Sequence, residues 1–461
     1  MRCTRAEPES SNSGSARNHS LFGHTWPIFY FAGEAVTGLT DATRETGSTD
    51  GRADFNRLWA ADTVSYFGTA VTAVALPILA LEQLDASTFE VGLLSAAGVA
   101  AWLVFGLSAG AWIERRTKRP LLIACDLIRA AVLLSVPLVA MLDLLTLPYL
   151  VSVALVIGVA TVFFDIASQT YLPAVIAPQH LVSGNSKLQV SDTAAQTGGP
   201  AVGGLMVQLV GAVTSLVVDA VSYLLSALFL ARIRGREKVP EPQNSTSVLP
   251  QIREGLLFVW SDPIFRPLML VAAGLNLLGS AFDTLLIPFL INEFGFSPAE
   301  VGISLAIGGV GALAGSIVGP FVARRFGAAK ALWAAAFIGP PLGLLVPFSQ
   351  AGLGMVLFAV GLFGREACIA MYSLMARSVR QMASPPHLLA RVTATIKFVS
   401  WGVLPIGAIA GGTLGQTLGV RPAILVFCVL LLLTSTPLWF VSRKEVQQQI
   451  DTAVANAGRD D

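Results

Sequence analysis

Apolar residues from Phe55 onward form long runs that are separated by short polar segments. Each run is long enough to cross a bilayer as a helix, which needs about 20 residues. The pattern therefore predicts an all-α membrane protein with twelve transmembrane helices embedded in a lipid bilayer. The predicted spans are residues 55–82, 89–113, 120–142, 147–171, 187–209, 212–232, 265–291, 299–323, 329–349, 352–376, 392–416 and 420–441.

The polar segments divide these runs into two sets of six. Residues 1–53 are rich in polar and charged residues, so we expect a disordered N-terminal tail. Two six-helix bundles are predicted over residues 54–232 and 265–442. Residues 233–264 would form a cytoplasmic linker, in which Ile252 to Trp260 reads as an amphipathic surface helix. Residues 443–461 would form a cytoplasmic C-terminal tail.

Positively charged residues gather in alternate loops between the runs. The opposite loops offer one cation, Arg421, against the acids Glu82, Asp85, Asp143 and Glu293. Because cytoplasmic loops carry an excess of Lys and Arg, the cation-rich loops are predicted to be cytoplasmic. The sequence thus predicts a multi-pass protein of the inner or plasma membrane with both termini in the cytoplasm. The cation-rich loops hold Arg115, Arg116, Lys118, Arg119, Lys187, Arg232, Arg234, Arg236, Lys238, Arg253, Arg324, Arg325, Lys330, Arg377, Arg380, Arg391, Arg443 and Lys444.

Short sequence motifs recur at nearly equal spacing in the two halves. The tripeptide Glu-Val-Gly occupies residues 90–92 and again 300–302, which is 210 residues later. The pair Gly203-Gly204 matches Gly411-Gly412, which is 208 residues later. Six helices repeated in the same orientation imply two bundles related by an axis along the membrane normal, with a site between them.

Composition excludes several classes of protein. The chain is 54% hydrophobic and 13% charged, against about 25% charged residues in soluble proteins. A net charge of +1 gives no reason to expect a nucleic-acid partner. The four cysteines are far apart and the four histidines lie outside the apolar runs, so no metal site is predicted. No catalytic or nucleotide-binding motif is found, so we expect neither an enzyme nor a cofactor.

The segment between the second and third runs is a charged hairpin. Residues 114–119 contain one acid and four cations. Their spacing resembles the loop signature of the major facilitator superfamily, in which a Gly is followed after three residues by an acid, a base and further bases. Glu stands here in place of the more usual Asp. The plainer interpretation is a positively charged membrane anchor. The matching residues are Gly110, Glu114, Arg115, Lys118 and Arg119.

The resemblance to this superfamily extends over about residues 55–442. Within the superfamily, several short sequence motifs are similar to those of the branch of macrolide-efflux and enterobactin-exporter proteins. It implies the major facilitator fold and the export of a small molecule by alternating access. The motifs on which this resemblance rests are Val74–Pro77, Asp126–Ala130, Phe163–Ala167, Tyr171–Pro173, Asn185–Lys187, Gly199–Gly204, Asp219–Ser222, Leu389–Val392 and Leu404–Pro405.

One set of charged residues is predicted near the cytoplasmic side. Asp126 and Arg129 are three residues apart and would form an ion pair on one helical face. Asp165 and Lys187 are expected nearby, and the resemblance implies that such a cluster latches the bundles together. The alternative is a static ion-pair network. The candidate latch residues are Gly110, Glu114, Arg115, Lys118, Arg119, Asp126, Arg129, Asp165 and Lys187.

A second set of charged residues lies deeper in the predicted helices. Charges are costly there and mark transport pathways or proton relays. Arg365 and Glu366 are adjacent, so we expect them to find different partners. Alternatively, Glu366 only neutralises a cation such as Arg365 or Lys397. The candidates for proton coupling and the substrate cavity are Asp62, Asp219, Asp283, Arg365 and Glu366.

Small residues and prolines would let neighbouring helices approach closely or bend. We interpret most of them as packing residues that do not touch the substrate. They are Gly199, Pro200, Gly203, Gly204, Pro405, Gly411 and Gly412.

These features together predict a monomeric secondary transporter. It would act as a proton-coupled antiporter that exports small lipophilic or amphipathic compounds, as in drug or antibiotic efflux. The alternative is a dedicated exporter of a siderophore or another endogenous secondary metabolite. A non-transporting membrane receptor or scaffold would need neither the internal repeat nor the buried acids.

Overall fold

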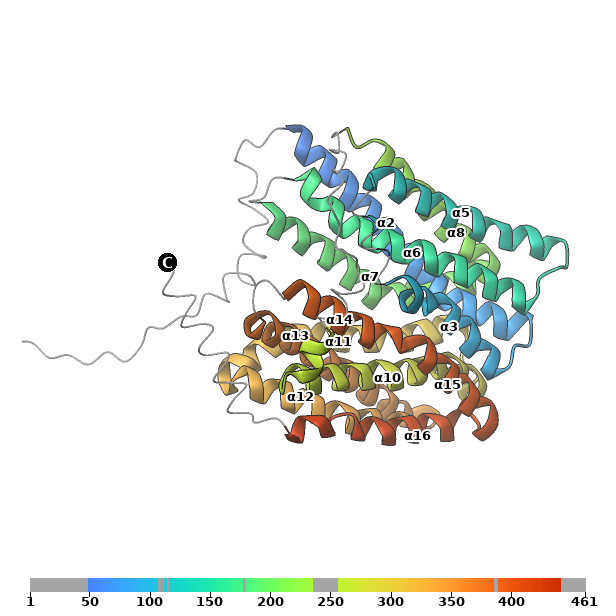
Figure 1. The fold of residues 1–461 in the computed structure, drawn as a ribbon. Coiled ribbons are helices and arrows are strands. Elements are labelled where there is room, and N and C mark those ends of the chain that lie inside the picture. Colours follow the sequence, from blue (N-terminus) through green and yellow to red (C-terminus); the bar gives the residue numbers. More distant parts are fainter. Residues whose placement is uncertain are drawn as a thin grey trace, which may run out of the picture. The chain divides into compact units, whose positions relative to one another are not determined.

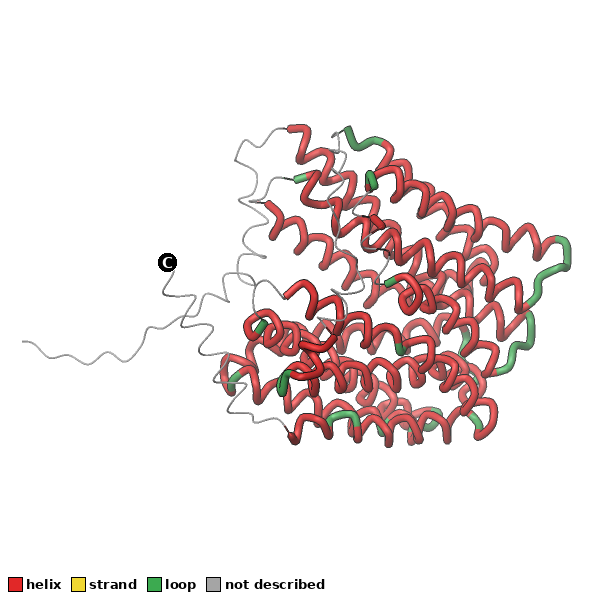
Figure 2. Tube along the Cα trace, viewed as in Figure 1, coloured by secondary structure: helices red, strands yellow, loops and turns green. Residues whose placement is uncertain are grey.

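The computed structural model describes residues 49–106, 109, 112–113, 116–176, 180–234, 256–384 and 389–440. Over these residues the chain forms helices, turns and loops but no strand, which confirms the all-α prediction (Figure 2). Most of the predicted N-terminal tail, most of the linker and the C-terminal tail lie outside the described residues. Residues 49–53 were assigned to the tail, and this was wrong, because they form the first part of helix α2.

Six long helices make up the first half of the described chain. Helix α2 packs against α7 and α8, α5 packs against α6 and α8, and α3 packs against α6. They are α2 (Thr49–Gln83), α3 (Thr88–Phe105), α5 (Lys118–Met141), α6 (Leu147–Val175), α7 (Leu181–Val210) and α8 (Ala212–Ala231).

The second half repeats this arrangement with some helices interrupted (Figure 1). Helix α13 packs against α11 and α12, and α10 packs against α15 and α16. The helices are α10 (Phe265–Phe294), α11 (Pro298–Phe326), α12 (Ala328–Gly343), η3 (Val346–Phe348), η4 (Gly352–Gly354), α13 (Met355–Ala383), α14 (Leu389–Gly402), α15 (Leu404–Leu418), α16 (Val420–Leu433) and η5 (Thr436–Phe440).

Eleven helical stretches of the described chain are long and apolar enough to cross a membrane. The predicted span that is not among them is 187–209, which lies within the 30-residue helix α7. Polar residues such as Asn185, Lys187 and Asp192 lower the hydropathy of α7 without shortening it. The eleventh predicted span, 392–416, is divided between α14 and α15, with Pro405 at the start of α15.

The two ends of the helices are distinguished by the direction of α2. We call the end at which α2 begins the inner end, since the cation pattern predicts that it is cytoplasmic. The opposite end, at which α2 ends and α3 begins, is the outer end.

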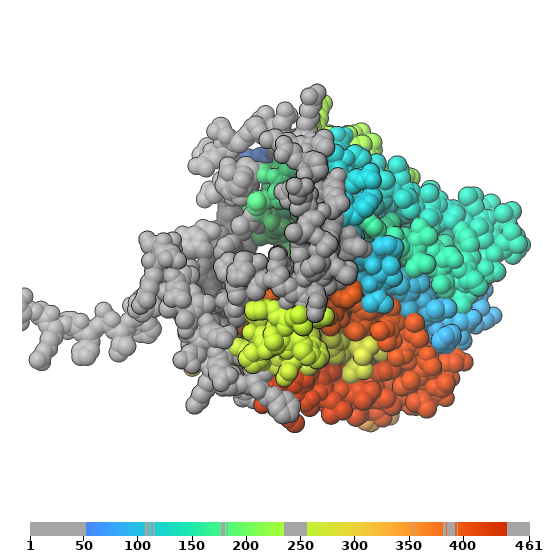
Figure 3. Space-filling view, viewed as in Figure 1, coloured from blue at the N-terminus to red at the C-terminus, as the bar shows by residue number. Residues whose placement is uncertain are grey.

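The two halves meet along two pairs of helices, α7 with α11 and α3 with α15. In the space-filling view, blue and cyan atoms of the first half adjoin orange and red atoms of the second half (Figure 3). Both pairs of helices make close backbone contacts near the outer end. There a methyl group on Gly92 would lie 2.8 Å from the Cα of Gly412, and one on Gly302 would lie 2.9 Å from the Cα of Gly204.

These contacts explain the internal repeat. Each Glu-Val-Gly motif begins a helix, because Glu90 and Glu300 each close a capping box with the serine three residues before, Ser87 or Ser297. The glycine that follows, at 92 or 302, packs against the Gly-Gly motif of the opposite half. The two repeated motifs therefore pack crosswise, and each half supplies one motif to each of the two contacts.

Candidate transport site

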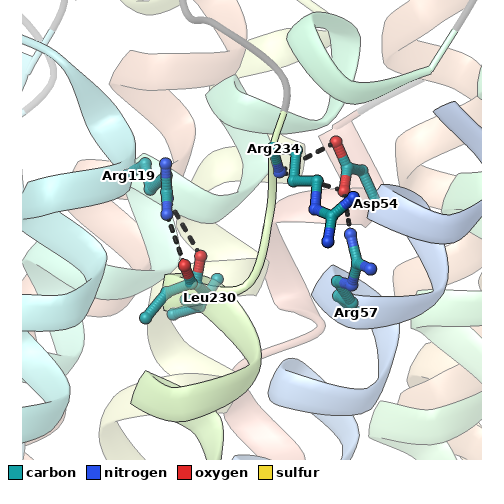
Figure 4. A network of polar contacts seen from close by, with 6 residues as sticks. Asp54, Arg57, Arg119, Leu230 and Arg234 are labelled. Atoms are coloured by element: carbon teal, nitrogen blue, oxygen red, sulfur yellow. Dashed lines mark hydrogen bonds and ion pairs between the residues drawn. The ribbon is translucent and has the colours of Figure 1, made fainter. Parts of the chain in front are cut away.

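A polar network joins helices of the first half at the inner end (Figure 4). Asp54 of α2 forms an ion pair of 2.5 Å with Arg57 and accepts hydrogen bonds of 3.1 Å from the backbone N–H of Arg234. Arg119 of α5 donates a hydrogen bond of 3.0 Å to the backbone carbonyl of Leu230. It donates a second one to the backbone carbonyl of Ala231. Arg119 is a predicted latch residue, and these two bonds hold α5 to α8 within one half.

Other predicted latch residues are dispersed or lie outside the described residues. Gly110, Glu114 and Arg115 belong to the latter group, so their role stays a prediction. Lys118 is the first residue of α5. The ammonium group of Lys187 lies 5.8 Å from the centre of the Phe55 ring, against α2.

Asp126 and Arg129 form a buried ion pair on α5, with side chains 0% and 2% exposed. The guanidinium of Arg129 also lies 4.3 Å from the ring centre of Phe164 and 4.2 Å from that of Tyr223. Charge pairing and cation–π contacts thus compensate Arg129 within the first half. This geometry favours the static network over a latch for these two residues.

Two further acids are buried inside the first half. Asp62 of α2 accepts a hydrogen bond of 2.7 Å from Ser168 of α6. Its other oxygen, Oδ1, is buried and has no hydrogen-bond partner among the described residues. Asp219 of α8 is better satisfied, since it accepts hydrogen bonds from Thr72 and, at 2.9 Å, from Ser222. An unpartnered polar atom in an apolar interior is costly. Oδ2 of Asp126 is also buried without a partner, but Asp126 is paired with Arg129, whereas Asp62 has no ion pair within the described chain.

A cavity of about 450 Å³ lies among α2, α5, α6 and α7. Asp165 is ten residues before Val175, the last residue of α6, so it lies about 15 Å from the inner end at 1.5 Å per residue. This depth is near the middle of a hydrocarbon core that is about 30 Å thick. The cavity is lined by Ser65, Tyr66, Thr69, Ala70, Ala73, Arg129, Thr161, Phe164, Asp165, Asp192, Ala195, Gln196 and Pro200.

The second half holds a compact charged group around Arg365 of α13. Its guanidinium pairs with Glu366 and, at 3.1 Å, with Asp283 of α10, and lies 4.2 Å from the ring centre of Phe282. The expectation that Arg365 and Glu366 would find different partners was wrong. A long side chain with five N–H donors can turn back to its neighbour and still reach a second carboxylate. Asp283 is 57% exposed, whereas Arg365 is 3% exposed.

Sequence reasoning missed the surroundings of Lys397. This residue of α14 lies 4.9 Å from the ring of Trp102 in α3 and 4.8 Å from the ring of Trp401. The two tryptophan rings are 4.7 Å apart and pack edge to face. The contact joins the two halves, but its members are nearly 300 residues apart in sequence. No local pattern could have indicated it, and Asp192 was also overlooked.

The predicted packing residues lie at close helix contacts. A methyl group on Gly203 would lie 3.1 Å from the Cα of Val71, and one on Gly411 would lie 2.9 Å from the Cα of Ala281. Gly204 and Gly412 belong to the crosswise contacts between halves. Three predicted packing residues remain. Gly199 lies against Ala70, and Pro200 lines the cavity. Pro405 is buried at the start of α15.

Comparison with known proteins agrees with this architecture. The model of the transmembrane secretion effector family matches residues 51–457. A multidrug efflux pump named Tap from Mycolicibacterium fortuitum is 28% identical over 392 residues, which cover 82% of this chain and 92% of the pump. Tap of Mycobacterium tuberculosis is 27% identical over 374 residues, covering 78% of this chain and 86% of its own.

Solved structures of low sequence identity show the same fold. A bacterial homologue of the iron transporter ferroportin, in an inward-facing state, matches with a TM-score of 0.69 and 17% identity. The match covers 84% of this chain and 99% of that one. A bacterial homologue of the human lysosomal transporter Spinster matches with a TM-score of 0.67 and 14% identity. This match covers 88% of this chain and 99% of the homologue. The chain therefore belongs to the transmembrane secretion effector family of the major facilitator superfamily and is a multi-pass membrane transporter.

Proposed function

We propose that this transporter exports small amphipathic or lipophilic compounds from the cell by alternating access. The observation that carries the proposal is a mid-depth cavity together with close contacts between the halves near the outer end. A cavity of about 450 Å³ is within the range of about 300–1,000 Å³ that is typical of small-molecule sites. The efflux role of the Tap pumps, which align over most of this chain, supports the direction of transport.

The outer contacts have the properties of a gate that opens and closes repeatedly. Backbone meets backbone at Gly92 with Gly412 and at Gly204 with Gly302. Among the described residues no ion pair joins the halves at these glycines, and the neighbouring Val91, Val207 and Val301 are buried in one apolar cluster that both halves share. Each contact is made by one helix from each half, so rocking of the halves would open both at once, as repeated bundles do in secondary transporters. The state described here would be the one closed at the outer end.

Proton coupling is the finer part of the proposal. A proton-driven exporter needs a carboxyl group whose surroundings change during the cycle, because burial disfavours its charge and a nearby cation favours it. Asp62 is the first candidate, since one of its buried oxygens has no partner among the described residues and, unlike Asp126, it has no ion pair with a cation there. Asp283 and Glu366 share Arg365, so the one that binds a proton would lose its negative charge and release Arg365 to the other.

Transport by energised everted membrane vesicles tests the proposal directly. We expect accumulation of aromatic dyes and macrolides inside the vesicles, and its collapse when a protonophore is added. Accumulation of siderophores alone would favour the alternative, a dedicated exporter of an endogenous metabolite. If vesicles with the protein accumulate no compound above vesicles without it, the proposal is wrong. Protease protection of tags at the two termini would test the proposed cell-membrane topology with both termini cytoplasmic.

A further inference from the structure

The walls of the cavity carry an excess of negative charge. Asp165 of α6 and Asp192 of α7 both line it, and Arg129 is the one cation among the lining residues of this described cavity. Arg129 is already paired with Asp126 and lies against two aromatic rings. Arg129 also interacts electrostatically with Asp165, so its single positive charge is shared between Asp126 and Asp165.

Neither cavity carboxylate is neutralised by a close ion pair within the described chain. Asp165 forms no hydrogen bond or ion pair with other described residues, and it is half-buried. Asp192 accepts hydrogen bonds of 2.8 Å from Gln196 and 3.3 Å from Gln189, which are neutral amides. Amide donors orient a carboxylate but leave its charge in place. The cavity thus presents two carboxylates at a depth where charge is costly.

A cation from the other half also acts on this charge at longer range. After Arg129, Lys397 of α14 is the cation that interacts electrostatically with Asp165. Its ammonium group is held by the rings of Trp102 and Trp401, at 4.9 and 4.8 Å from their centres. Lys397 is thus an amine on an apolar stem, set among aromatic rings and attracted to Asp165. These are the features of an amphipathic organic cation, supplied by the protein itself.

We propose that the cavity among α2, α5, α6 and α7 binds organic monocations that carry aromatic or apolar groups, with Asp165 as their counter-ion. Lys397 balances Asp165 when the cavity is empty and competes with the cation for it. The half-buried ring of Tyr66 in the cavity wall provides the aromatic contact, and Ala70 and Ala73 provide apolar surface. The inference rests on the proposed export function only in treating the ligand as cargo, since binding itself needs no transport.

A divalent metal ion suits this cavity less well than an organic cation. The described residues contain no group of three or more His, Cys, Asp or Glu side chains that could hold a metal ion. Two carboxylates with an aromatic and apolar wall favour a ligand with one positive charge and a hydrophobic body. Ca²⁺ or a transition metal would require more oxygen, nitrogen or sulfur ligands than these.

Two probes of nearly the same shape test the proposal. Methyltriphenylphosphonium is a permanent cation, and triphenylphosphine oxide is its neutral counterpart. Binding of both to the purified full-length protein would be measured by equilibrium dialysis. We expect the cation to bind at least about tenfold more tightly, which corresponds to about 1.4 kcal/mol. The variant Asp165→Asn should lose this preference and keep its affinity for the neutral probe, whereas Lys397→Met should bind the cation more tightly.

Asp143→Asn is the matched control, because it removes one carboxylate from an exposed loop outside the cavity. Its affinity for both probes should equal that of the wild type. Asp192→Asn provides a second test if Asp165→Asn fails to fold, and it should weaken cation binding as well. Equal affinities for the two probes, unchanged cation binding in both variants, or no binding of either probe would overturn the proposal. Loss of export with retained cation binding would count against the export function alone.

Discussion

Gly92 of α3 and Gly412 of α15 are so close that a methyl group on Gly92 would lie 2.8 Å from the Cα of Gly412. The same relationship recurs between Gly302 of α11 and Gly204 of α7. No side chain separates the two halves at these crossings, so the backbones themselves form the contact. A larger residue at either position would have to displace a neighbouring helix, since real Cβ atoms do not approach backbone atoms within 3 Å.

The first prediction concerns this contact. Gly92→Ala should hold the outer end open and reduce export by about tenfold, because overpacking costs about 1–3 kcal/mol and about 1.4 kcal/mol is a factor of ten. Labelling of a cysteine near the outer end should become faster. Gly98→Ala in the same helix is the matched control, because a methyl group there meets no atom within 4 Å. Equal export by both variants would show that the crossing does not limit the cycle.

The second prediction concerns energy coupling. Asp62→Asn should abolish uphill export and substrate-evoked proton movement, while downhill exchange of cargo continues, because an amide can keep the bond from Ser168 but cannot carry a proton. Both fluxes would be measured in proteoliposomes with an imposed proton gradient. Glu366→Gln should behave in the same way if the group around Arg365 takes part.

Proton-dependent uphill export by the Asp62→Asn, Glu366→Gln double variant would exclude both residues as carriers. Asp219 and Asp283 would then be the next candidates. Loss of downhill exchange as well would indicate a structural role, in which Glu366 only neutralises Arg365.

The third prediction concerns the ion pair between Asp126 and Arg129. Arg129→Met should lower the free energy of unfolding by about 3–5 kcal/mol, because it leaves a buried carboxylate without its cation. Thermal unfolding in detergent would measure the loss. The double variant Asp126→Asn, Arg129→Met should recover much of the stability, since the unpaired charge is gone. A stable but slow Arg129→Met transporter would instead favour the latch.

The fourth prediction concerns the charged hairpin. Glu114→Ala or Arg115→Ala should leave the protein inserted but slow its turnover, and the inner end should become more accessible to labelling. Arg116→Ala in the same hairpin is the control, since Arg116 lies 5.1 Å from the ring of Trp112 and outside the resembling pattern. Wild-type rates in both variants would mean that the hairpin is only an anchor.

The sequence by itself determined which segments form helices. A run of apolar residues long enough to cross a bilayer satisfies its backbone hydrogen bonds internally, so length and composition suffice to predict it. The repeat was visible for the same local reason, because Ser87 and Ser297 each begin a helix with the same capping box. The pairing of Asp126 with Arg129 also follows from spacing along one helix.

Tertiary structure alone decided which residues meet. The glycines of one repeat pack against those of the other half, Lys397 reaches a tryptophan of α3, and Arg365 binds both its neighbour and Asp283. Periodicity tells which side of a helix a residue occupies, but not which helix faces that side. Such contacts depend on the packing of helices that are far apart in the chain, and long side chains can reach beyond their own face. For that reason Asp165 and Asp192 are brought to one cavity, and Lys397 within electrostatic reach of Asp165, only by the folded protein.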